Sequence, residues 1–144
     1  MPDSAEEREL SPLERQILTK IVDLTTGDAA DALRAQLAVA RFKEAWFEGS
    51  QSFDVWLPDD VPLDPTPATM SNGRRILHGL MVYNGEAAQG STRSRFWPWA
   101  RSSKEPDPTG EIFLWIIDGR LDALEYPWWT TDMPDRLPEL EQLR

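Results

Sequence analysis

The stretch that decides the fold of this chain is Gly110-Glu-Ile-Phe-Leu-Trp-Ile-Ile-Asp-Gly-Arg-Leu-Asp-Ala-Leu-Glu-Tyr126. Two apolar runs meet at Asp118-Gly119, a pair that readily adopts the positive φ angles of a type I′ turn. We therefore predict a β-hairpin over 110–126. Its first strand is apolar on both faces, so we expect it near the centre of a sheet with both faces covered.

Two helices are predicted ahead of the strands. Ser11, Pro12 and Glu14 form a capping-box start, and apolar residues then repeat at helical spacing to about residue 24. After the break at Thr25-Thr-Gly27, Asp28 is expected to cap a second helix. The small residues of that helix allow the two helices to pack closely.

Period-two alternation follows the helices. It predicts a second hairpin from residues 42–48 and 52–57 and a further strand over 75–83. Prolines between Pro58 and Pro67 exclude a paired strand there, because proline has no amide donor. The expected fold class is α+β, with two N-terminal helices packed on a twisted antiparallel sheet of about five strands.

The length of 144 residues fits a single domain over 1–144. We expect its ends, 1–10 and 139–144, to be flexible. Residues 86–109 are expected to form a long surface excursion, and 127–138 to be an extended segment whose two tryptophans pack on the body.

Composition excludes several classes of protein. The chain has no cysteine, which rules out disulfides, thiolate zinc sites and a cysteine nucleophile, and no motif implies a cofactor or a metal. The sequence shows neither a secretory signal nor a membrane-length apolar run, so we expect a cytoplasmic protein. The net charge of −10 disfavours nucleic acid as a partner and favours a basic protein.

Charge is distributed in blocks. Residues 71–104 carry 1 acid and 6 bases, whereas the segments before and after them are strongly acidic. We expect an acidic face for a basic partner, with a basic-aromatic loop at its edge. The candidate binding residues are Asp59, Asp60 and Asp64 on the acidic face, and Arg93, Arg95, Trp97, Trp99 and Arg101 on the loop. The alternative for this loop is attachment to its own domain through the tryptophans, and a third, less favoured role is stacking on nucleic acid.

No catalytic motif anchors an enzyme hypothesis. The chain has no phosphate-binding loop and no nucleophile elbow. A structural role is favoured for His78, the only histidine, and Glu125 is expected to pair with an arginine. Asp118, Asp122 and Glu125 surround the hairpin turn, where carboxylates could bind a hard cation or form an acid–base pair, but their spacing does not match a calcium loop and Asp118 is explained by the turn.

The pattern Leu114-Trp-Ile-Ile-Asp-Gly-Arg-Leu-Asp-Ala-Leu-Glu-Tyr126, continued by Thr131-Asp132, Pro134 and Leu137-Pro138, resembles the ending of small uncharacterised bacterial proteins. Residues 33–41 are also similar to their second helix and first strand. The resemblance covers about a third of the chain. It implies a compact α+β protein without an assigned catalytic residue, of a kind that includes suspected immunity or partner-binding proteins.

The function expected from the sequence is that of a non-enzymatic protein-binding domain. The specific hypothesis is an immunity-type inhibitor of a basic toxin or nuclease, for which acidity and surplus tryptophan are suited. The alternatives are a small hydrolytic or ligand-binding enzyme that uses Glu125 and His78, and a housekeeping protein.

Overall fold

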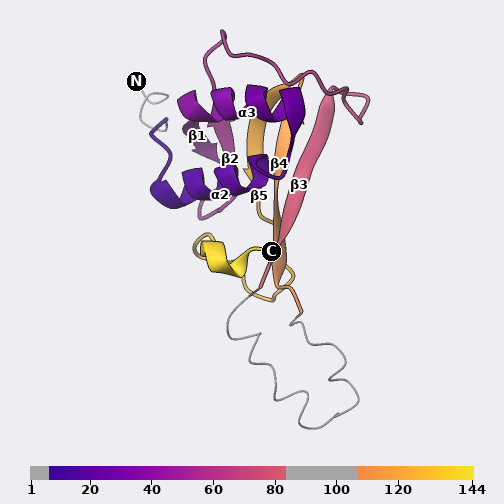
Figure 1. The fold of residues 1–144 in the computed structure, drawn as a ribbon. Helices are drawn as coiled ribbons and strands as arrows, with labels where there is room; N and C mark the ends of the chain where they lie inside the picture. Colours follow the sequence, from indigo (N-terminus) through magenta and orange to yellow (C-terminus); the bar gives the residue numbers. More distant parts are fainter. Residues whose placement is uncertain (1–6, 84–106) are drawn as a thin grey trace, which may run out of the picture.

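The computed structural model of the chain describes residues 7–83 and 107–144. In this part of the chain, two helices precede a five-stranded sheet (Figure 1). The elements are α2 (Pro12–Val22), α3 (Gly27–Val39), β1 (Arg41–Ala45), β2 (Phe53–Trp56), β3 (Arg74–Val82), β4 (Gly110–Ile117), β5 (Arg120–Glu125) and the 3-10 helix η2 (Leu140–Gln142). The strands are ordered β1-β2-β5-β4-β3 and every neighbouring pair is antiparallel. The predicted α+β fold class is confirmed.

The capping box predicted at the start of α2 is present. The Glu14 amide donates to the Ser11 hydroxyl at 3.1 Å, and the Ser11 amide donates to the Glu14 carboxylate at 2.7 Å. The helix ends at Val22, slightly before the expected residue 24. The N-cap of α3 is Thr26, two residues before the expected cap at Asp28.

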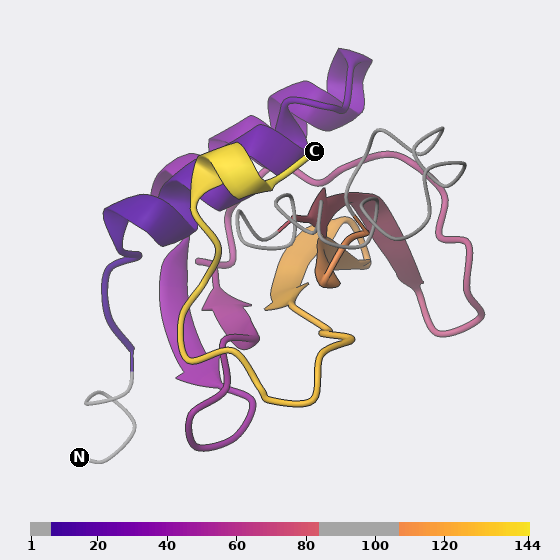
Figure 2. The ribbon, with the colours of Figure 1, turned by 90° about the horizontal axis from the view of Figure 1, so that it is seen from below.

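Both helices lie on the same face of the sheet (Figures 1 and 2). Helix α2 packs on β3 and β4, and α3 packs on β5. The core between the layers combines the apolar stripe of α2 with alternate strand residues, and its fully buried members include Ile17, Leu18, Ile21, Leu33, Phe53, Leu77, Ile112, Leu114, Ile116 and Leu124.

The Asp118-Gly119 turn joins β4 to β5 as predicted. Asp118 has a φ of 51° and Gly119 a φ of 80°, the pair of positive angles that a type I′ turn requires. Strand β4 lies between β5 and β3, in the interior of the sheet.

The described residues near the two ends of the chain, which we expected to be flexible, are paired with strands of the sheet. The amide of Arg144 donates to the Met81 carbonyl at 3.0 Å, the amide of Met81 donates back at 2.9 Å, and Leu143 is 3% exposed. Residues 142–144 therefore pair with the outer edge of β3, because an edge strand offers unpaired backbone groups. At the other end, Arg8 forms an isolated bridge with Phe42, and Leu10 is buried.

The segment between β5 and η2 is loop, as predicted. Figure 2 shows it running from the end of β5 to η2. Trp128 is half-buried and pairs with Gly110, but Trp129 is exposed. The expectation that both tryptophans pack on the body is therefore wrong for Trp129.

None of the helices in residues 7–83 and 107–144 combines the length and the apolar composition that crossing a membrane requires.

Candidate functional site

The face of the sheet opposite the helices is the candidate functional surface; we name it the open face. Strand β4 shows the difference between the two faces most clearly. Ile112, Leu114 and Ile116 are buried under the helices, whereas the intervening residues of β4 are half-buried. Since alternate side chains of a strand point to opposite sides, Phe113, Trp115 and Ile117 lie on the open face.

The open face contains a hollow of about 390 Å³, which we name the acidic hollow. It combines two indole rings with four carboxylates and one guanidinium. The residues that line it are Glu44, Ala45, Trp46, Asp54, Arg74, Trp115, Asp122 and Glu125, from all five strands or the residue just after β1. An adjoining hollow of about 400 Å³ includes Lys43, Trp56 and Arg120 and shares Asp122 with the first.

Two β-bulges place charged residues on the open face. In β5, Leu121 pairs with Ile116 and Ala123 pairs with Trp115, which leaves Asp122 as the extra residue. A β-bulge redirects the side chain of its extra residue, and bulges are common beside functional sites. A second bulge in β1 leaves Lys43 between Phe42 and Glu44, the residues that pair with Val55 and Asp54.

Hydrogen bonds fix the two indoles against two of the carboxylates. Trp46 Nε1 donates to Asp54 Oδ1 at 3.0 Å, and Trp115 Nε1 donates to Glu125 Oε1 at 2.8 Å. Among the described residues, Glu125 therefore pairs with an indole and not with the arginine that we expected. The pairing follows from the hairpin, in which Glu125 lies opposite Phe113, two residues from Trp115.

The electrostatics of the acidic hollow are dominated by negative charge. Burial, and then the neighbouring carboxylate of Asp54, raise the pKa of Asp122, although Arg74 and Lys43 act to lower it. The Arg74 guanidinium lies over the Trp115 ring, 5.3 Å from its centroid. A cation that enters the hollow would reduce the repulsion between Asp54 and Asp122.

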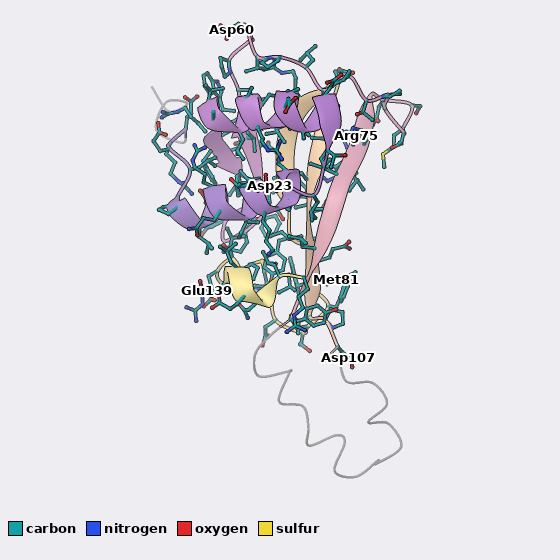
Figure 3. The ribbon with its side chains drawn as sticks, viewed as in Figure 1. Asp23, Asp60, Arg75, Met81, Asp107 and Glu139 are labelled. Atoms are coloured by element: carbon teal, nitrogen blue, oxygen red, sulfur yellow. The ribbon has the colours of Figure 1, made fainter. Side chains whose placement is uncertain are left out.

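The three aspartates expected on the acidic face lie in the loop after β2. Asp59 and Asp60 are exposed, and Figure 3 shows Asp60 at the outer end of this loop. Neither residue lines the acidic hollow. A binding role for these two residues stays a prediction.

Asp64 has a different environment from the one expected. It is 4% exposed, its carboxylate forms an ion pair with Arg75, and the Thr66 amide donates to it at 2.9 Å. Burial acts to raise its pKa, but the hydrogen bonds from Arg75 and Thr66 outweigh burial, so the pKa lies below the ordinary value. Asp64 holds the loop to the sheet and is not available to a partner as proposed, because its charge is already neutralised inside the fold.

The same region contains a buried amide. Gln36 of α3 donates to the Pro62 carbonyl at 2.7 Å and the Gly119 carbonyl at 2.8 Å, and it accepts from the Leu121 amide at 2.8 Å. One side chain thus joins the helix, the proline-containing loop and the hairpin turn. This network supports the fold on the side away from the open face.

The remaining candidates are not brought together in the described structure. Arg93, Arg95, Trp97, Trp99 and Arg101 lie outside the described residues. His78 belongs to β3, at the irregularity in its pairing between Leu77 and Leu80. Within residues 7–83 and 107–144, no group of three or more histidine, aspartate or glutamate side chains is arranged to hold a metal ion.

Of the residues of the acidic hollow, the sequence analysis considered Asp122 and Glu125 and missed the others. Period-two alternation puts Trp46, Asp54 and Trp115 on strand faces, but it does not say which strands are neighbours. A bulge also has no reliable sequence signature, so the position of Asp122 could not be derived.

Comparisons with known proteins bring no relative to this chain: no family model, no curated protein and no solved structure matches it.

Proposed function

We propose that this chain is a non-enzymatic protein-binding domain that binds a basic protein through its open face. The observation that carries the proposal is the acidic hollow, in which four carboxylates and two indoles are accompanied by one guanidinium. Tryptophans supply much of the affinity of protein interfaces, and complementary charge accelerates association. The partner class that fits best is a basic toxin or nuclease, which the chain would neutralise as an immunity-type inhibitor.

The charge of the whole chain supports this choice of partner. The net charge of −10 repels nucleic acids, acidic proteins and a second copy of the chain at long range. The open face also holds apolar surface beside the acids, since Trp46 and Ile76 are each 42% exposed. A basic protein can contact both kinds of surface at once.

Photo-cross-linking tests the proposal in the cells that produce the chain. The photoreactive residue p-benzoylphenylalanine is placed at position 76, on the open face beside Trp115, and as a control at position 28, at the exposed start of α3. We expect a basic protein to be cross-linked from position 76 and not from position 28. The purified pair should then bind less tightly as salt is raised.

Charge reversal provides a second test on the purified pair. Asp54→Lys with Asp122→Lys should slow association much more than the matched double change Asp59→Lys with Asp60→Lys in the exposed loop. A partner cross-linked only from position 28, an acidic partner, or binding that salt does not weaken would contradict the proposal.

One observation favours a hydrolytic enzyme as the second candidate. A carboxyl whose pKa is raised by burial and by a neighbouring carboxylate, as for Asp122 beside Asp54, is a pattern found at acid–base sites. This candidate requires that the wild type turn over a member of a chromogenic glycoside and ester panel, and that Asp122→Asn abolish the turnover. If the chain is a non-enzymatic binding domain, we expect no turnover of any substrate in the panel.

A further inference from the structure

The acidic hollow has features that select a particular side chain of a basic partner; this inference rests on the proposed function. The chain itself shows that a guanidinium fits here, because Arg74 already lies over the Trp115 ring. A guanidinium gains energy from an aromatic face by stacking and by cation–π attraction.

The Trp46 side of the hollow is open. Its indole N–H is occupied by Asp54, which fixes the ring, while the side chain is 42% exposed. Among the described residues, the guanidinium groups that lie over aromatic rings belong to Arg8, Arg74 and Arg144, over Phe42, Trp115 and Tyr83. The face of Trp46 is therefore free to take a cation from outside the described chain.

Asp122 supplies an acceptor in the same hollow as Trp46. In residues 7–83 and 107–144, no hydrogen-bond donor reaches its carboxylate, whereas Asp54 and Glu125 are each held by an indole. The β-bulge holds Asp122 half-buried at the hollow, where it lies near the charge of Asp54. An incoming group with several N–H donors and a positive charge would satisfy the carboxylate and offset the repulsion.

We infer that the acidic hollow is the receptor for one arginine side chain of the basic partner, with its guanidinium on the Trp46 ring and its N–H groups donated to Asp122. Arginine suits the hollow better than lysine does. A guanidinium is planar, stacks on an indole and carries five N–H donors, whereas an ammonium is a compact and strongly hydrated charge.

Nuclear magnetic resonance titration with short peptides tests the inference. The probes are Ac-Ala-Arg-Ala-NH2, the lysine analogue, and the citrulline analogue, which has nearly the shape of arginine without its charge. We expect the arginine peptide to shift the Trp46 indole N–H signal in a saturable way, with a dissociation constant in the millimolar range. Binding of the lysine peptide should be about threefold weaker, and the citrulline peptide should cause no saturable shift.

A matched pair of variants distinguishes binding in the acidic hollow from general attraction to a negatively charged protein. Asp122→Asn should weaken arginine-peptide binding about tenfold, the effect of losing a charge-assisted hydrogen bond. Asp60→Asn removes the same charge from the exposed loop and should change binding less than about twofold. Equal effects of the two variants, equal binding of arginine and citrulline peptides, or lysine binding as tight as arginine would overturn the inference.

The results distinguish this inference from the proposed function. If a basic partner is cross-linked from position 76 while the arginine peptide leaves the Trp46 signal unshifted, the arginine site is wrong and the binding function stands. If the peptide binds at Trp46 but no basic protein is cross-linked from position 76, the proposed function fails and the arginine site stands.

Discussion

The two faces of the sheet use the same strands in opposite ways. On the helix-covered face, β4 contributes Ile112, Leu114 and Ile116 to a closed apolar core. On the open face, the next residues along the same strand lie among carboxylates and half-exposed tryptophans. An apolar residue in a strand therefore does not by itself show that its face of the sheet is covered by other elements.

The carboxylates differ between the faces as the apolar residues do. Asp64, on the helix-covered side, is neutralised by Arg75, whereas Asp122, on the open face, has no hydrogen-bond donor in the described chain. Their pKa values move in opposite directions from the ordinary value. The folded structure therefore favours the charged form of Asp64 and disfavours the charged form of Asp122.

The largest expected effect is on stability and compares two neighbouring isoleucines of β4 that lie on opposite faces of the sheet. Ile116→Ala, at a residue 2% exposed, should lower the free energy of unfolding by about 3 kcal/mol, because it removes a buried side chain and leaves a cavity. Ile117→Ala, at the half-buried neighbour, should cost about 1 kcal/mol. Urea unfolding measures both, and equal losses would show that the open face is as closed as the other.

The next effect tests the turn that joins β4 to β5. Gly119 has a φ of 80°, and a Cβ there would lie 2.8 Å from the Asp64 carbonyl oxygen, so Gly119→Ala should cost about 2 to 3 kcal/mol. Gly27 has a φ of 76° with no atom within 4 Å of such a Cβ, so Gly27→Ala should cost about 1 kcal/mol. The difference between the two losses of unfolding free energy measures the packing of the loop around Asp64 on the turn. Equal losses would mean that the loop moves aside at no cost when a side chain is added at Gly119.

A third prediction concerns the paired carboxylate. Asp64→Asn should cost about 2 kcal/mol at pH 7, because it leaves the Arg75 guanidinium without its partner. The pKa of Asp64 is lowered in the folded state, so its contribution is present above the ordinary pKa of 3.8 and is lost as the pH falls through the folded value. Urea unfolding from pH 7 to 2 should therefore show the variant and the wild type converging below about pH 4. A difference that persists at pH 2 would contradict this assignment.

The smallest effect has the opposite sign. Asp122→Asn should stabilise the fold at pH 7 by no more than about 1 kcal/mol, because solvent screens charges at this half-exposed position. Since the folded-state pKa of Asp122 is raised, the stability that its protonated form provides is lost as the pH rises through that pKa, and the gain of the variant should appear only above it. The same unfolding series tests this prediction, and a loss of stability at pH 7 would show that Asp122 supports the fold.

The sequence predicted the helices, strands and turns better than it predicted the contacts that individual residues make in the folded chain. The capping box at Ser11 and Glu14 and the turn at Asp118-Gly119 were correct, because each depends on residues at most three positions apart. The pairing of Leu143 with the sheet was not foreseen, because it depends on the distant edge of β3. Asp64 was misjudged for the same reason, since its partner Arg75 is brought to it by the loop.

The sequence by itself determined two helices, five strands and the turn chemistry that connects β4 to β5, because local hydrogen bonds and backbone angles encode them. Only the tertiary structure decided which face of the sheet the helices cover and which side chains meet on the other. Alternation tells which residues of a strand share a face, but the strand order and the bulge at Asp122 arise from pairing between distant segments. The acidic hollow, formed by residues from five strands, is for that reason a property of the folded chain.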